Sequence, residues 1–169
     1  LTWTIAQQYG PFYMRMTRSK VPIVHNESQE FEIGKSITLR DGSDCTIAAC
    51  GITVKMALDA AEQLKQEGIS CRVIDCFTIK PIDKEILEKA ARETGGIVTC
   101  EEHNIMAGFG SAVSEVVSES YPVPIKRIGA QDMFGESARD NEISQLLEKH
   151  GITSINIANM VKEIRSKKQ

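Results

Sequence analysis

The fold is decided by the stretch that runs from Cys45-Thr-Ile-Ala-Ala-Cys50 to Cys71-Arg-Val-Ile-Asp-Cys76. Both ends are short apolar runs with β-branched residues, which predicts two buried strands. Between them apolar residues recur at helical spacing, with Thr53 as the expected N-cap and Gly68 as the expected stop. The residues at that spacing are Val54, Ala57, Leu58, Ala61 and Leu64. The order strand, helix, strand predicts a βα unit that leads into a parallel strand.

The same unit repeats toward the C-terminus. Ile97-Val-Thr-Cys-Glu101 and Ile125-Lys-Arg-Ile-Gly129 are two further strand candidates. One helix is expected to begin at the cap Asp83 and another after Gly108-Phe-Gly110. Strands that alternate with helices at this short period pair in parallel through right-handed crossovers. We therefore predict an α/β fold with three layers and a doubly wound, mostly parallel sheet.

The two ends of the chain differ from this repeat. Two helices are expected at the C-terminus, one around Asp140 to His150 and one from Ser154. Ile37 to Leu39 predicts a short edge strand before the Asp41-Gly42 turn. Phe12-Tyr-Met-Arg-Met-Thr17 predicts a single strand, which cannot bury its own faces. We therefore expect residues 1–20 to end another domain, 21–36 to form a linker and 37–169 to form the α/β domain.

Composition excludes several classes of protein. The chain has 169 residues, 20 Lys and Arg against 23 Asp and Glu, and 41% hydrophobic residues, which fits a globular domain. A net charge of −3 provides no basic field for nucleic acid. No apolar stretch approaches the roughly 20 residues of a membrane span, and the first residues do not form a signal peptide. We expect a cytoplasmic protein and, because the chain begins at Leu1, a piece of a longer one.

The five cysteines are expected to be reduced, buried thiols. These cysteines are Cys45, Cys50, Cys71, Cys76 and Cys100. An odd count in a chain of this size argues against a disulfide framework. The two C-x4-C pairs lack zinc-knuckle spacing and lie in predicted strands, where residues five apart face opposite sides. No metal site is expected.

Glu101-Glu102-His103 follows the third predicted strand, at the edge where open α/β sheets bind ligands. Paired carboxylates beside an imidazole suit acid/base chemistry, which makes Glu102 and His103 weak catalytic candidates. Without a nucleophile or metal partner nearby, capping of the next loop or a subunit contact is the favoured interpretation.

Two further groups could bind anions. Gly108, Gly110 and Ser111 precede a helix, whose free N–H groups could hold an anion, although simple turning of the backbone also explains the glycines. Only two glycines are present, so a nicotinamide site is not expected. Arg15 and Arg18 lie near the end of the first predicted strand. Arginine suits phosphate because its planar fork donates two hydrogen bonds at once.

Three ordered motifs resemble the C-terminal domain of transketolases, most closely the split type in which this section is a separate polypeptide. They are Val73-Ile-Asp-Cys-Phe-Thr-Ile-Lys-Pro-Ile-Asp83, Thr99-Cys-Glu-Glu-His-Asn-Ile-Met-Ala-Gly-Phe-Gly-Ser-Ala-Val-Ser-Glu115 and Ile128-Gly-Ala-Gln-Asp-Met-Phe-Gly-Glu-Ser137. Residues 10–22 are similar to the last strand of the family's pyrimidine-binding domain and its exit, so residues 1–20 would be the tail of that domain.

The resemblance implies an enzyme of the pentose phosphate pathway that moves a two-carbon ketol unit from a ketose phosphate to an aldose phosphate. It also implies thiamine diphosphate and Mg²⁺ in the full enzyme, held by the N-terminal and middle domains and not by this piece. This piece would act as scaffold, support a homodimer and supply Arg18 to the substrate phosphate. Alone it is expected to be inactive.

The family pattern leaves alternatives open. Ala107 and Ala138 stand where family members often carry glycine. The Thr78-to-Asp83 motif also resembles 2-oxo-acid dehydrogenase β subunits, and the Glu101-to-Met106 run resembles deoxyxylulose phosphate synthase. A noncatalytic module that binds an anion or mediates assembly is a further alternative.

Overall fold

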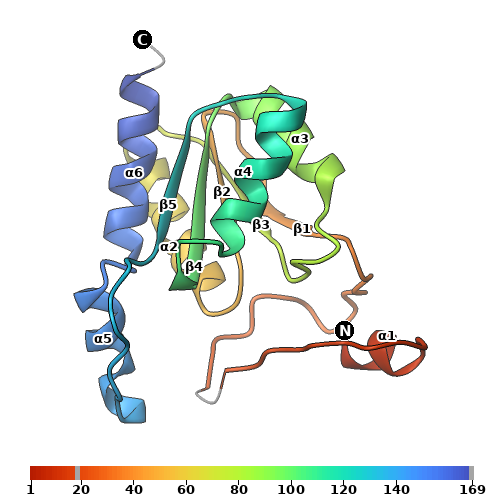
Figure 1. The fold of residues 1–169 in the computed structure, drawn as a ribbon. Coiled ribbons are helices and arrows are strands. Elements are labelled where there is room, and N and C mark those ends of the chain that lie inside the picture. The colour runs from red at the N-terminus through yellow and green to blue at the C-terminus, as the bar shows by residue number, and fades with distance from the viewer. Residues whose placement is uncertain (18–19, 168–169) are drawn as a thin grey trace.

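The computed structural model describes residues 1–17 and 20–167, and its centre is a five-stranded sheet (Figure 1). The strand order is β1-β3-β2-β4-β5. Strands β2 to β5 are parallel, whereas β1 pairs antiparallel with β3 at one edge. The strands are β1 (Ile37–Arg40), β2 (Cys45–Ala49), β3 (Cys71–Asp75), β4 (Ile97–Asn104) and β5 (Ile125–Ala130). The predicted fold class and all five strands of the domain are confirmed.

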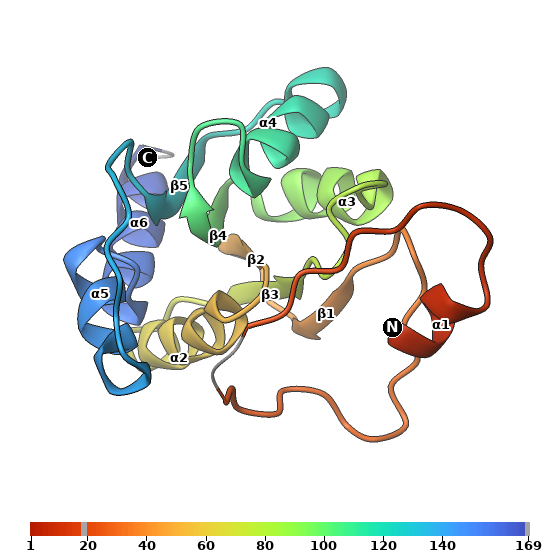
Figure 2. The same cartoon turned by 60° about the horizontal axis from the view of Figure 1, so that its bottom comes forward.

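Helices cover both faces of the sheet, which gives three layers (Figures 1 and 2). Helices α2 and α6 pack on one face and α3 and α4 on the other. The helices are α1 (Thr2–Ala6), α2 (Thr53–Gln66), α3 (Lys84–Thr94), α4 (Phe109–Ser120), α5 (Ile143–Lys149) and α6 (Ser154–Ser166), with a 3-10 turn η1 (Asp140–Glu142) before α5. The two helices predicted near the C-terminus are therefore present.

Alternation along the strands divides the core between the two faces. Ile47 and Ala49 pack with α2 and α6, whereas Ala48 and Cys50 pack with α3 and α4. All five residues of β2 and of β3 are buried. A parallel sheet covered on both faces requires such continuous apolar strands.

One predicted helix cap is confirmed and one is wrong. Asp83 accepts a hydrogen bond from the Ile86 N–H at 3.2 Å and begins α3. Thr53 is the first residue of α2, not its N-cap, which is Ile52. The Thr53 hydroxyl instead donates to the carbonyls of Cys50 and Cys100, each at 2.8 Å. It thereby links the ends of β2 and β4.

A buried carboxylate begins α4. Glu101 is fully buried in β4, and its two oxygens accept from the N–H groups of Phe109 at 2.6 Å and Gly110 at 2.8 Å. A carboxylate at this position satisfies free donors and interacts favourably with the helix dipole. A Cβ on Gly108 would overlap the Glu101 carboxylate, so glycine is required for this close approach.

The N-terminal region contains a helix but not the predicted strand. Helix α1 is followed by residues 11–17, which form neither helix nor strand. A strand was predicted for Phe12 to Thr17, but a strand needs a neighbour to pair with, and the described chain places none beside it. Residues 21–36 also contain no helix or strand.

The five cysteines are free and buried, as predicted. Burial raises the pKa of the Cys71 and Cys76 thiols to about 12 and also raises the pKa of Cys50 and Cys100. None of the helices in the described part of the chain combines the length and hydropathy needed to cross a bilayer.

Glu101→Gln should lower the free energy of unfolding by about 2 kcal/mol, because the amide replaces one acceptor with a donor that faces the α4 N–H groups. Urea denaturation measures the change. Glu115→Gln, on the exposed side of α4, is the matched control and should stay within about 0.5 kcal/mol of the parent. Equal stability of the two variants would contradict the capping role.

A thiol reagent such as Ellman's reagent should react with none of the five cysteines in the native chain at pH 8, because access and thiolate formation are both suppressed. After unfolding in guanidinium chloride, all five should react. Rapid reaction of any thiol in the native chain would contradict this burial.

Candidate functional site

The candidate site lies at the carboxyl edge of the sheet, beside the point where the strand order reverses. From β2 the chain crosses through α2 to β3, and from β4 it crosses through α4 on the other face to β5. Neighbouring strands β2 and β4 thus send their connections in opposite directions. In open α/β sheets this arrangement opens a crevice beyond the strand ends, where ligands bind.

The three residues Glu101, Glu102 and His103 point to three different places. Glu101 is buried and caps α4. Glu102 lies beside the β2–α2 turn, where its Oε1 is 3.4 Å from the position of a Cβ on Gly51. His103 lines a cleft on the other face, with its Nδ1 3.6 Å from Glu101 Oε2. Glu102 and His103 therefore do not form one acid/base pair.

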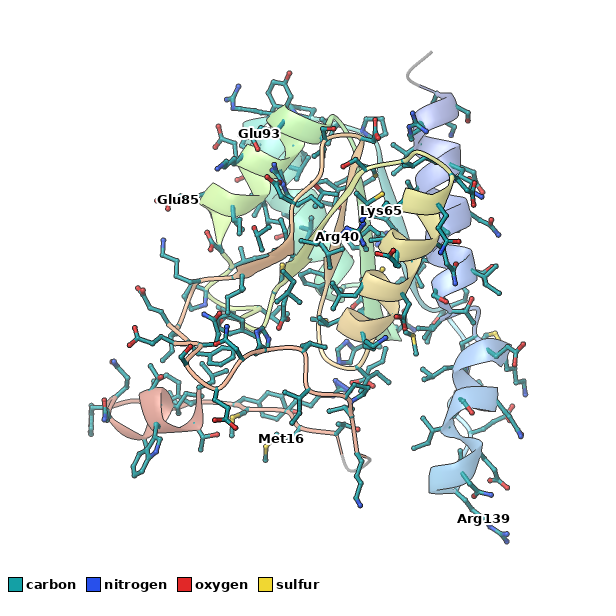
Figure 3. The ribbon with its side chains drawn as sticks, turned by 180° about the vertical axis from the view of Figure 1, so that it is seen from behind. Met16, Arg40, Lys65, Glu85, Glu93 and Arg139 are labelled. Atoms are coloured by element: carbon teal, nitrogen blue, oxygen red, sulfur yellow. The ribbon has the colours of Figure 1, made fainter. Side chains whose placement is uncertain are left out.

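Arg15 contacts Glu102 across 87 residues of sequence. Its Nη2 donates to Glu102 Oε1, and the Glu102 side chain is only 15% exposed. Figure 2 shows the red N-terminal segment running past the strand ends toward the start of α2. The neighbouring Met16 is 74% exposed and points away from the domain in Figure 3. The Arg15–Glu102 ion pair thus fastens an otherwise exposed segment to the end of β4.

A second ion pair fastens the linker to the end of β3. His25 Nε2 lies 2.8 Å from Asp75 Oδ2, and the two side chains are 17% and 8% exposed. The His25 ring packs edge-on against Phe31, which packs edge-on against Phe77. Burial raises the pKa of the Asp75 carboxyl, while the His25 hydrogen bond acts in the opposite direction.

The predicted anion site at Gly108, Gly110 and Ser111 already contains a carboxylate of this chain. Glu101 accepts the N–H of Gly110, and the Ser111 N–H donates to the Gly108 carbonyl at 3.1 Å. The Ser111 hydroxyl donates to the Ile105 carbonyl at 3.2 Å and accepts from Arg127 at 3.1 Å. Binding of an external anion stays a prediction, and it would require displacement of Glu101.

A cleft of about 610 Å³ separates the β3–α3 loop from α4. Its lining includes the cationic Lys80 and Lys84, the anionic Glu115 and Glu119, and His103. Because both signs of charge are present, the cleft does not resemble a site built for phosphate.

Arg18 lies outside the described residues. On its N-terminal side, Arg15 holds the N-terminal segment at the edge through Glu102. On its C-terminal side, His25 holds the linker there through Asp75. Sequence reasoning missed His25 and Asp75. Asp75 did carry a signal, since a carboxylate that ends a wholly buried strand requires a partner.

Within residues 1–17 and 20–167, no three His, Cys, Asp or Glu side chains converge in a way that could hold a metal ion.

Residues 34–157 match the family model described as the transketolase C-terminal domain. The chain is 40% identical over 159 residues to the 6-deoxy-6-sulfo-D-fructose transketolase subunit of Clostridium sp., covering 94% of this chain and 48% of that protein. It is 39% identical over 164 residues to 1-deoxy-D-xylulose-5-phosphate synthase of Heliobacterium modesticaldum, covering 95% of this chain and 25% of that protein.

A solved structure described as a split gene transketolase, inactive β4 tetramer, superimposes with a TM-score of 0.84 and 45% identity. The match covers 90% of this chain and 49% of that one. The chain thus spans about half the length of the transketolase subunits it matches, and a quarter of the synthase. The expected resemblance is confirmed, and the chain belongs to the transketolase C-terminal domain family.

Proposed function

We propose that this chain is the C-terminal portion of a transketolase, which transfers a two-carbon ketol unit from a ketose phosphate to an aldose phosphate. Its own contribution is to provide the scaffold at the crevice edge and to supply Arg18 to the substrate phosphate. The observation that supports this role is the contact between Arg15 and Glu102. It holds the N-terminal segment at the carboxyl edge, beside the point between β2 and β4 where the strand order reverses.

The cofactor of the proposed reaction is thiamine diphosphate, which supplies the carbanion chemistry that the amino acids lack. In this proposal the cofactor diphosphate and its metal ion are bound by the N-terminal and middle parts of the enzyme. Glu102 is paired with Arg15 and His103 faces the cleft, so the two side chains do not act together on one proton.

The proposed partners are the N-terminal and middle parts of a transketolase, as domains of one chain or as a second subunit. Self-association as a homodimer is part of this proposal, and the β4 assembly named for the similar split transketolase supports it. That assembly is described as inactive, which agrees with a chain that has no turnover without its partner.

A synthase that forms 1-deoxy-D-xylulose 5-phosphate is the second candidate, because one such enzyme is 39% identical over 95% of this chain. Product analysis of the complete enzyme distinguishes the two activities. Formation of the deoxypentulose phosphate, without ketol exchange between sugar phosphates, would favour the synthase.

Arg18→Ala in the complete enzyme should lower kcat/KM for a ketose phosphate by about 10- to 150-fold, which corresponds to the loss of a charged hydrogen bond worth about 1.5–3 kcal/mol. Steady-state kinetics with a phosphorylated donor and an unphosphorylated donor measure the selectivity. The unphosphorylated donor should lose little, since it offers no phosphate.

The matched control is Arg92→Ala, which removes an exposed arginine paired with Glu88 on α3 and should leave both donors unaffected. An Arg18→Ala enzyme that keeps its full preference for the phosphorylated donor would overturn the assignment of Arg18.

A further inference from the structure

The stretch between Arg15 and His25 is fastened at both ends to carboxylates of the sheet edge. Glu102 lies at the end of β4 and Asp75 at the end of β3. These two strands flank β2, so the two carboxylates stand on either side of its carboxyl end. With neighbouring strands about 4.8 Å apart, roughly 10 Å separates the strands that carry the two carboxylates.

The segment before this stretch has little else to hold it. Residues 11–17 make no backbone hydrogen bond to another described residue, and Tyr13 and Met16 are 90% and 74% exposed. The sulfur of Met14 contacts only the Thr2 hydroxyl of α1, at 3.8 Å. Among the described residues, Glu102 is the side chain through which the α/β domain holds this segment.

The linker anchor has a different character because it is buried. The His25 and Asp75 side chains are 17% and 8% exposed, and the His25 ring packs edge-on against Phe31, which packs edge-on against Phe77. Further along, the Ser36 N–H donates to Asp83 at 2.9 Å, which leads the linker into β1. The return side of the stretch is therefore fixed by contacts independent of Arg15.

We propose that Glu102 and Asp75 are positioning residues for Arg18, because through Arg15 and His25 they hold the chain at the carboxyl edge on both sides of Arg18 in the sequence. The inference rests on the proposed function, in which Arg18 binds the substrate phosphate. A loop with two fixed ends samples fewer conformations before the substrate arrives, so less entropy is lost when it binds.

The anchors themselves are tested in this chain by limited proteolysis. Glu102→Gln should raise the rate of chymotrypsin cleavage at Tyr13 and Met16 at least about threefold, because removal of the carboxylate charge frees the segment. Cleavage after Phe134, which is 99% exposed and far along the chain, is the internal reference. His25→Gln should likewise raise tryptic cleavage after Lys20, and it avoids the risk that Asp75→Asn disturbs the core.

Two variants sharpen this measurement. The exchange Arg15→Glu with Glu102→Arg restores a pair of opposite charges and should return cleavage close to the parent rate. Glu67→Gln removes the exposed Lys162–Glu67 pair between α2 and α6 and should change nothing at Tyr13. Cleavage of the Glu102→Gln chain at the parent rate would overturn the anchor.

The positioning role is tested in the complete enzyme. Glu102→Gln should lower kcat/KM for the phosphorylated donor by about 3- to 10-fold, mainly through KM, and leave the unphosphorylated donor unchanged. In an Arg18→Ala background the same substitution should cause no further loss, because the effect passes through Arg18. The role would be overturned if Glu102→Gln lowered kcat/KM equally for both donors. It would also be overturned if Glu102→Gln lowered kcat/KM as much in the Arg18→Ala enzyme as in the parent.

The two proposals fail separately. If Arg18→Ala leaves phosphate selectivity intact, the proposed function of Arg18 falls and the positioning role falls with it, while proteolysis still decides whether the anchors exist. If Arg18→Ala removes selectivity but Glu102→Gln does not reduce it, only the positioning role is overturned.

Discussion

The buried carboxylate of Glu101 controls the geometry of the carboxyl edge. Its two oxygens accept the first N–H groups of α4, which fixes that helix on β4 and requires glycine at position 108. Because side chains alternate along a strand, Glu102 must then face the opposite side, toward the β2–α2 turn. In the sequence, Glu102 resembles one member of an acid/base pair with His103. In the structure, it is instead the partner of Arg15.

Local signals were sufficient to predict the α/β domain. The apolar runs at Cys45 and Cys71, the Asp83 cap and the Gly68 stop each indicate an element without reference to distant residues. Thr53 was misassigned because its hydroxyl has acceptors at two strand ends, Cys50 and Cys100, and the second lies 47 residues away. Short-range rules cannot weigh such an alternative partner.

The edge contacts were beyond prediction for the same reason. Arg15 and Glu102 are 87 residues apart, and His25 and Asp75 are 50 residues apart. Nothing in the sequence around any of these residues specifies its partner. The strand predicted at Phe12 to Thr17 was wrong because a strand needs a neighbouring strand to pair with. Among the described residues, an ion pair and not a ladder of hydrogen bonds holds the segment to the domain.

The edge is electrostatically incomplete without the N-terminal region. Asp75 is buried enough that its pKa is raised, and His25 is the group that favours its charged form. Glu102 is mostly shielded from water, and Arg15 is its cationic partner. A carboxylate that is shielded from water costs free energy unless it has a cationic partner. Asp75 and Glu102 therefore both favour the state in which the N-terminal region covers them. The core of the domain uses neither contact, so the edge can hold the chain at Arg15 and at His25 without any demand on the packing of the core.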